Sequence, residues 1–180
     1  MRADELIRAT ENSKIYLDMD GVLADFFAEY TVLAGLPRGS SYRDIPPAKV
    51  DPTLNKMIGT DFFARLPKFP TADSLVKLVL GYVDQYSICS SPLRGDHENS
   101  ESHKRVWIKK HLNPQPSEIV ITDMKERHAV NADSSPNILI DDRGDNITKW
   151  RARGGIGLKY QADEDSLNTV AQGLVHAYGK

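Results

Sequence analysis

The hydrophobic residues of this 180-residue chain recur in two patterns that divide most of it into strands and helices. Short strand patterns built around apolar residues predict strands at 15–17, 85–92, 119–121, 137–140 and 155–158. Apolar residues at three- and four-residue steps predict helices at 23–34, 71–83, 103–112, 145–150 and 167–178. Because strands alternate with helices, we predict an α/β fold, a three-layer Rossmann-like sandwich with a mainly parallel sheet.

Polar residues suggest where several helices begin. Thr71 and Asp145 are expected to cap the starts of their helices, and the acidic run 163–166 precedes the last helix. The polar stretch 94–103 is predicted to be a loop that reaches toward a ligand.

The segment 35–70 does not follow the alternating pattern. Its short apolar pieces are separated by Pro37, Pro46, Pro47, Pro52, Pro67 and Pro70. Long insertions in compact domains are often lids or binding loops, and a lid keeps water out once a substrate is bound. We therefore predict a core domain made of 1–34 and 71–180, with a small, mostly helical cap of 35–70 inserted after the first strand.

Two predicted strands end in pairs of carboxylates. Asp18 and Asp20 follow the first strand, and Asp141 and Asp142 follow the fourth. Ligands in open α/β sheets bind at the carboxyl ends of strands, so the pairs are expected to meet there. Four carboxylates in one partly desolvated site repel one another unless a cation neutralises them. Oxygen ligands without a Cys or His cluster favour a hard ion, so the sequence predicts a Mg²⁺ site.

Hydroxyl and cationic side chains follow the second predicted strand. Ser90 and Ser91 close that strand, and hydroxyls in this position can hold phosphate oxygens, although a plain Ser-Ser-Pro turn is an equal alternative. The guanidinium of Arg94 can bind a phosphate with two hydrogen bonds. Lys104 and Lys125 can each supply a fixed cation opposite a phosphoryl group, with a surface position as the alternative for both.

The order of these motifs resembles that of the haloacid dehalogenase-like phosphatases, which have an Asp-x-Asp strand, a Ser/Thr strand, a lysine and an acidic pair. The chain is more closely similar to the 5'(3')-deoxyribonucleotidases in Asp-Met-Asp-Gly-Val-Leu-Ala-Asp-Phe at 18–26, in Ser-Ser-Pro at 90–92 and in Leu-Ile-Asp-Asp-Arg at 139–143. The resemblance spans residues 15–158. It implies the haloacid dehalogenase-like version of the predicted fold.

The resemblance also implies roles for these residues. It makes Asp18 the nucleophile and Asp20 the acid and base, and it gives Ser90 a phosphate contact. It implies Mg²⁺ held by the Asp18 carboxylate, the main-chain carbonyl at Asp20 and one residue of the late pair, with Asp142 preferred to Asp141. Such chemistry is feasible, because a carboxylate can attack phosphorus and a neighbouring acid can protonate the leaving group. No organic cofactor is required.

The two lysines match different lysines of the family, so both Lys104 and Lys125 remain candidates for the phosphate contact. Phe26, Phe62 and Phe63 are candidates for stacking against a nucleobase, although packing is at least as frequent a role for such rings.

The function implied by the resemblance is Mg²⁺-dependent hydrolysis of (deoxy)nucleoside monophosphates through an aspartyl-phosphate. Two alternatives stay open. One is a phosphatase of the same superfamily that acts on another small phosphomonoester. The other is a phospho-accepting receiver domain, whose motif order differs from the order found here.

Composition narrows the choice of partners. A net charge of −2 argues against a polynucleotide binder, and no apolar run approaches the ~20 residues of a membrane span. The start Met1-Arg2-Ala3-Asp4-Glu5 does not resemble a signal peptide, so a cytoplasmic location is expected. The single Cys89 cannot form an internal disulfide and is predicted to pack in the core. We expect a small-molecule substrate, and a homodimer is compatible with the sequence.

Overall fold

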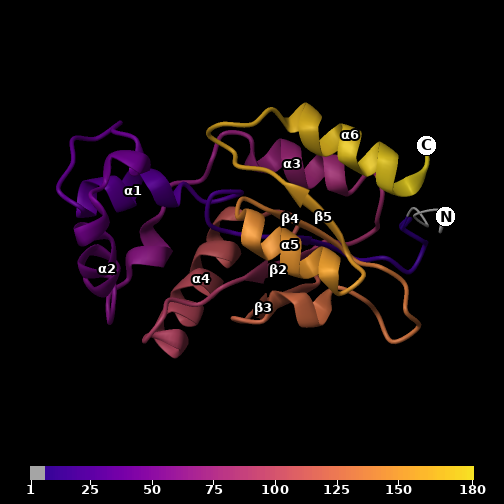
Figure 1. The fold of residues 1–180 in the computed structure, drawn as a ribbon, viewed down its shortest axis with the longest axis horizontal. Coiled ribbons are helices and arrows are strands. Elements are labelled where there is room, and N and C mark those ends of the chain that lie inside the picture. The colour runs from indigo at the N-terminus through magenta and orange to yellow at the C-terminus, as the bar shows by residue number, and fades with distance from the viewer. Residues whose placement is uncertain (1–6) are drawn as a thin grey trace.

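A five-stranded sheet forms the centre of the molecule (Figure 1). The computed structural model describes residues 7–180. Its strands are β1 (Ile15–Leu17), β2 (Ser87–Ser90), β3 (Glu118–Ile121), β4 (Ile138–Asp141) and β5 (Ile156–Lys159). They lie in the order β3-β2-β1-β4-β5, and every pairing is parallel. The predicted α/β fold with a mainly parallel sheet is confirmed, and the carboxyl ends of all five strands share one edge of the sheet.

The first six residues lie outside the described range. The prediction that residues 1–5 are not a signal peptide therefore concerns residues that are not described, and so does the start of the predicted core domain at residue 1.

Successive residues of the strands face opposite sides of the sheet, as the period of two in a strand requires. In β1, Ile15 and Leu17 belong to one hydrophobic core, whereas Tyr16 between them belongs to a second core. Strand β4 shows the same alternation. The central strands β1 and β4 are therefore buried on both faces, which explains why they are nearly continuous apolar runs in the sequence.

Helices cover both faces of the sheet. The larger core contains side chains of α3 (Ala72–Val79), α4 (His97–His111) and α6 (Leu167–Tyr178). Figure 1 shows α3 and α6 next to each other on one side of the sheet, where Tyr82 stacks on Tyr178. The smaller core contains side chains of α5 (Gly144–Ala152), which contacts the short helix η3 (Lys125–His128). The result is the predicted three-layer arrangement.

The helix starts differ in detail from the predictions. Thr71 stands at the cap position of α3, but its side chain makes no capping hydrogen bond. Asp145 lies inside α5 and receives hydrogen bonds from Arg143, which occupies the cap position instead. The predicted loop 94–103 is wrong from position 97 onward, because α4 begins at His97. Polar composition alone does not separate a loop from the exposed first turns of a helix, and this caused the error.

The chain between β1 and α3 contains α1 (Phe26–Leu33), η1 (Tyr42–Asp44), α2 (Pro47–Asn55) and η2 (Phe62–Arg65). In Figure 1, α1 and α2 lie together to one side of the sheet. The end of this segment is fixed to α4, where Trp107 Nε1 donates to the Leu66 carbonyl at 2.8 Å. The division into a core and a cap at 34/35 and 70/71 stays a prediction, and α1 lies beside α2 although that prediction assigns it to the core.

Burial tests the prediction for Cys89. Cys89 is fully buried, which confirms the prediction that it packs in the core. Among the helices of residues 7–180, none has the length and apolar character needed to span a bilayer.

Candidate active site

The loop after β1 is folded tightly onto itself. Asp18 continues the pairing with β4, since its N–H donates to the Ile140 carbonyl at 2.9 Å. Leu23 and Ala24 both donate to the Met19 carbonyl at 2.9 Å, which closes the loop. Gly21 has a φ of +79°, a conformation that glycine adopts without strain. The loop therefore holds the carboxylates of Asp18 and Asp20 in place at the edge of the sheet.

Lys104 lies on the buried face of α4 and joins the β1 loop to the end of β2. Its Nζ donates to Asp20 Oδ2 at 2.6 Å, to Ser90 Oγ at 2.9 Å and to the Ser91 carbonyl at 2.7 Å. These three acceptors use all three N–H groups of the ammonium. Burial raises the pKa of Asp20, and the charge of Lys104 opposes that rise. Asp20 Oδ1 has no hydrogen-bond partner among the described residues.

Lys125 joins the β1 loop to the end of β4 on the other side. Its Nζ lies 2.7 Å from Asp141 Oδ2 and 3.0 Å from Asp18 Oδ1. Burial disfavours the charged form of Lys125, but the charges of Asp18 and Asp141 outweigh this effect and raise its pKa. Asp141 also accepts from the Arg143 N–H at 2.8 Å and from Asn146 Nδ2 at 3.1 and 3.2 Å. Its carboxylate is therefore fully engaged by protein donors.

Asp142 differs from Asp141 because its carboxylate accepts no hydrogen bond from residues 7–180. Burial, together with the charges of Asp18 and Asp141, raises the pKa of Asp142 to about 9. The carboxylate fits against the β1 loop only because residue 21 is glycine. A Cβ at Gly21 would lie 2.6 Å from Asp142 Oδ2.

Three carboxylates form a group that fits a metal ion. Oxygens of Asp18, Asp141 and Asp142 lie within 4.8 Å of one another. Of the four predicted metal residues, the structure brings these three together, whereas the side chain of Asp20 faces Lys104. Asp142 is short of a partner, and oxygen-only donors suit a hard divalent cation. The residues present therefore fit the Mg²⁺ that the sequence predicts.

A cavity of about 650 Å³ opens at these strand ends. Asp18, Asp20, Lys125 and Asp142 line its floor, and Ser91 also borders it. Ser90 is fully buried below the cavity with its hydroxyl on Lys104. A volume of this size is typical of a small-molecule site.

Aromatic residues of the segment between β1 and α3 form a wall of the cavity. Phe26, Phe27, Tyr42 and Phe63 line it, whereas Phe62 does not. Two of the three predicted base-stacking residues, Phe26 and Phe63, thus border the site. Sequence reasoning did not select Phe27 or Tyr42, although Phe27 directly follows Phe26.

Charged residues surround the mouth of the cavity. Arg94 lines it with its side chain 81% exposed, and Arg94 Nη2 donates to Asp51 Oδ1 at 3.2 Å. Its contact with a phosphate stays a prediction. The lining residues that the sequence did not indicate include Asp123, Lys149 and Asn146. Asn146 had a usable signal, because it lies one helical turn after Asp142.

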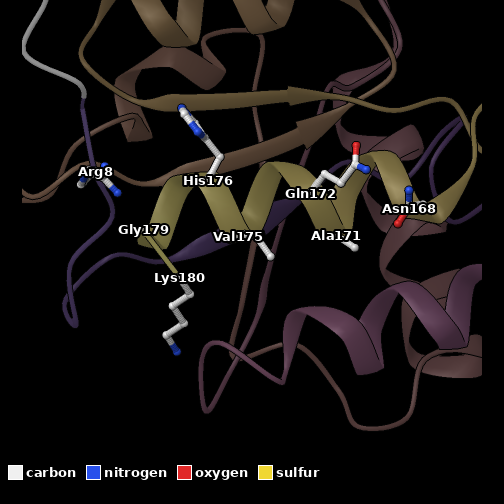
Figure 2. Close-up of a pocket in the computed structure, with 8 residues that line it drawn as sticks. All are labelled: Arg8, Asn168, Ala171, Gln172, Val175, His176, Gly179 and Lys180. Atoms are coloured by element: carbon white, nitrogen blue, oxygen red, sulfur yellow. The ribbon is translucent and has the colours of Figure 1, made fainter.

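A second hollow, of about 470 Å³, lies along α6 and is shown in Figure 2. Its lining residues are Arg8, Asn168, Ala171, Gln172, Val175, His176, Gly179 and Lys180. None of these eight residues is acidic, and none belongs to the predicted site. We therefore take the cavity at the strand ends as the candidate active site.

No protein-family model matches the chain. Over 164 residues the chain is 29% identical to the mitochondrial 5'(3')-deoxyribonucleotidase of Mus musculus, which covers 81% of this chain and 71% of that protein. Over 149 residues it is 30% identical to the cytosolic-type 5'(3')-deoxyribonucleotidase of Homo sapiens, which covers 72% of this chain and 70% of that protein.

Solved structures share the fold. An L-2-haloacid dehalogenase aligns with a TM-score of 0.54 at 13% identity, covering 83% of this chain and 85% of the other. A phosphonoacetaldehyde hydrolase-like protein from Oleispira antarctica aligns with a TM-score of 0.53 at 12% identity, covering 99% and 87%. At these identities the likeness shows a common fold and nothing about the substrate.

Proposed function

We propose that this chain, which belongs to the 5'(3')-deoxyribonucleotidase family of haloacid dehalogenase-like hydrolases, is a Mg²⁺-dependent phosphatase of (deoxy)nucleoside monophosphates. The observation that carries the proposal is that Asp18, Asp20, Asp142 and Lys125 line one cavity, with Lys104 buried beneath it on Asp20. The two relatives are 5'(3')-deoxyribonucleotidases, which supports the choice of a nucleotide as substrate. A cytoplasmic location and a homodimer stay predictions.

Asp18 is the proposed nucleophile. One of its oxygens attacks phosphorus, the bond between phosphorus and the ester oxygen breaks, and an aspartyl-phosphate forms. Water then attacks the same phosphorus, which releases inorganic phosphate and restores the carboxylate of Asp18. Lys125 holds Asp18 Oδ1 at 3.0 Å and thereby fixes the side chain for the attack.

Asp20 is the proposed acid and base. It gives a proton to the leaving alkoxide in the first step and takes one from water in the second. Its Oδ1 is buried without a hydrogen-bond partner among the described residues, and Lys104 fixes Oδ2. Burial raises the pKa of Asp20, which favours its role as a proton donor, while the charge of Lys104 opposes that rise.

The remaining residues bind the substrate and the ion. Asp18 and Asp142 would hold Mg²⁺, because Asp141 is already engaged by Lys125, Arg143 and Asn146. The bound ion supplies positive charge opposite the phosphoryl oxygens. Ser91 is the proposed phosphate contact at the cavity, and Arg94, paired with Asp51 at the mouth, is proposed to attract the negatively charged substrate.

The aromatic wall favours a nucleotide over other phosphomonoesters. Bases stack on aromatic rings, and Phe26 and Phe63 line the same cavity as the carboxylates. A phosphatase for another small phosphomonoester remains the second candidate, since the same catalytic residues would serve it. The receiver alternative is disfavoured, because receivers have the strand order 2-1-3-4-5 and this sheet has the order 3-2-1-4-5.

The test is a phosphate-release assay of the full chain with Mg²⁺. The substrates are deoxy- and ribonucleoside monophosphates and sugar phosphates. We expect release that prefers deoxyribonucleoside monophosphates and that is lost with EDTA and in Asp18→Asn. Asp51→Asn, a change of a carboxylate at the cavity mouth, is the matched control and should keep most activity. Undiminished release in EDTA would refute the metal requirement, and a preference for sugar phosphates would favour the second candidate.

A further inference from the structure

The short helix η3, which carries Lys125, is a single turn of four residues. A helix of one turn is not stable by itself, so contacts from outside must hold it in place. Some of these contacts come from α5. The end of η3 is fixed by hydrogen bonds from Asn137, the residue that directly precedes β4.

Asn137 donates to two carbonyls at the end of η3. Its backbone N–H donates to the Ala129 carbonyl at 2.8 Å, and its side-chain Nδ2 donates to the His128 carbonyl at 2.9 Å. The last carbonyls of a helix have no partner within the helix, so these two bonds determine where η3 lies. The second N–H of Nδ2 donates to Asn131 Oδ1 at 3.0 Å.

The amide oxygen of Asn137 binds the start of the first strand. Asn137 Oδ1 accepts from the Lys14 N–H at 2.8 Å, and the Lys14 carbonyl accepts from the Ile138 N–H at 2.8 Å. Lys14 directly precedes β1, so the starts of β1 and β4 are joined at this point. The side chain of Asn137 is buried and uses its oxygen and both N–H groups in these bonds. A fully satisfied buried amide of this kind holds its neighbours in one arrangement.

The three elements that meet at Asn137 also carry the three groups of one buried ion-pair cluster. Strand β1 leads into Asp18, β4 ends at Asp141, and η3 begins with Lys125. Lys125 Nζ lies 3.0 Å from Asp18 Oδ1 and 2.7 Å from Asp141 Oδ2. Asn137 lies at the other end of β4 and does not line the cavity. Any effect of Asn137 on the reaction must therefore pass through these elements.

We propose that Asn137 is a positioning residue for catalysis, which fixes η3 against the starts of β1 and β4 so that Lys125 reaches Asp18 and Asp141 together. The inference rests on the proposed function, in which Lys125 holds Asp18 for its attack on phosphorus. A misplacement of about 1 Å can cost about 10²-fold in rate, even when the change lies far from the reacting atoms. Because Asn137 acts through Lys125 and not on the substrate, its loss should lower kcat and leave KM nearly unchanged.

The test variant is Asn137→Leu. Leucine has nearly the shape of asparagine but cannot make the three side-chain hydrogen bonds, whereas the backbone N–H to Ala129 remains. We expect kcat for a deoxyribonucleoside monophosphate to fall about 10- to 100-fold, with KM within about threefold of wild type. The kinetics are measured at a temperature at which circular dichroism shows a folded chain. Asn137→Ala, in which water can take the place of the amide, is the second variant and should show the same split between kcat and KM.

Asn131→Leu is the matched control. Asn131 Nδ2 donates to the Asn12 carbonyl at 2.7 Å and to Ser135 Oγ at 2.8 Å, so these bonds serve the loop between η3 and β4. The substitution removes the same kind of amide from the same region but leaves the bonds from Asn137 to η3 in place. Its kcat should stay within about threefold of wild type. An equal fall of kcat in Asn131→Leu and Asn137→Leu would overturn the positioning role.

Nuclear magnetic resonance of the lysine ammonium groups reports on Lys125 without any substrate. Lys104 and Lys125 are 0% and 3% exposed, so their ammonium protons should exchange slowly with water and give separate ¹H–¹⁵N signals. Lys104, which binds Asp20, is the internal control. In Asn137→Leu, exchange should become at least about tenfold faster at Lys125 and change by less than about twofold at Lys104. Equal acceleration at both lysines would indicate a general loss of stability and would overturn the proposal.

The two readouts separate this inference from the proposed function. A wild-type chain that releases no phosphate, while Asn137→Leu accelerates exchange at Lys125 alone, would defeat the proposed function and leave the positioning of Lys125 standing. Unchanged exchange at Lys125 in Asn137→Leu would defeat the inference alone, whatever the activity of the wild type.

Discussion

The two lysines of the site bind their neighbours in different ways. Lys125 lies between two buried carboxylates, Asp18 and Asp141, at the ends of neighbouring strands β1 and β4. Lys104 has one carboxylate, Asp20, and takes its other two acceptors from the end of β2, which is the other neighbour of β1. The loop after the central strand β1 therefore places Asp18 on the side of β4 and Asp20 on the side of β2.

This difference separates two tasks. The Lys125 side concentrates negative charge, since it contains three carboxylates and a single ammonium. The Lys104 side is close to neutral, because one ammonium faces one carboxylate and two neutral oxygens. A nucleophile and a cation site require the first environment, and a proton donor requires the second.

The largest expected effect distinguishes the two aspartates. Asp18→Asn should reduce turnover of a deoxyribonucleoside monophosphate by about 10⁴-fold or more, because no nucleophile remains. Asp20→Asn should lose about 10²–10⁴-fold, the range for general acid catalysis. With p-nitrophenyl phosphate, whose leaving group needs no proton, Asp20→Asn should regain much of its rate in the first step while Asp18→Asn does not. Steady-state and burst kinetics on both substrates measure this.

Circular dichroism and urea unfolding serve as the control for both variants, since Asp and Asn have the same shape. Turnover above about 1% of wild type in Asp18→Asn is incompatible with its assignment as nucleophile.

The next effect is on stability. Lys125→Met leaves Asp18 and Asp141 buried without their cation, and such a change costs about 3–5 kcal/mol of unfolding free energy. Lys104→Met should cost less, about 1–3 kcal/mol, because Asp20 borders the cavity and water can reach it. Urea unfolding at neutral pH without Mg²⁺ measures both. A larger loss of unfolding free energy in Lys104→Met than in Lys125→Met would contradict the conclusion that Lys125 neutralises more buried negative charge than Lys104.

The sequence predicts the sheet well because its strands are buried on both faces. Continuous apolar runs such as 15–17 and 137–140 have no other place in a domain of this size. The helix ends are predicted less well, because they depend on single hydrogen bonds. The first helix, predicted from Leu23, begins at Phe26 since Asp25 Oδ1 accepts from the Ala28 N–H.

The candidate site, too, is only partly predictable from the sequence. The sequence indicates which residues meet, because parallel strands end at one edge, but it does not indicate how the lysines pair. The burial of Lys104 could have been predicted from the stripe of α4 that also contains Ser100, Trp107 and Ile108. The aromatic wall is harder to predict. Neighbouring residues of a 3₁₀ helix point about 120° apart, so Phe63 lines the cavity and Phe62 does not.

A substitution at Gly21 should have a smaller effect on the Lys125 side than the loss of Lys125 itself. Gly21→Ala combines a positive φ of +79° with a Cβ 2.6 Å from Asp142 Oδ2, so it should strain the loop and displace the free carboxylate. Gly39 is the matched control, because its φ is +91° and nothing lies within 4 Å of an added Cβ. Each variant should lose about 1–2 kcal/mol of stability.

Only Gly21→Ala should also raise the Mg²⁺ concentration needed for half-maximal phosphate release, by about three- to tenfold. Mg²⁺ titrations of both variants measure this. An unchanged Mg²⁺ requirement in Gly21→Ala would argue against Asp142 as a ligand.

The smallest effect is expected on the Lys104 side, where Arg94 follows the Ser90-Ser91-Pro92 turn. An exposed ion pair such as that between Arg94 and Asp51 contributes about 0–1 kcal/mol, so Arg94→Gln should lower kcat/KM by less than about fivefold if Arg94 only attracts the substrate. Added salt should remove most of this loss, because exposed charges are screened. A loss above about fiftyfold that persists at high salt would mean that Arg94 leaves Asp51 and forks onto the phosphate, and the Lys104 side would then bind phosphate as well as deliver protons.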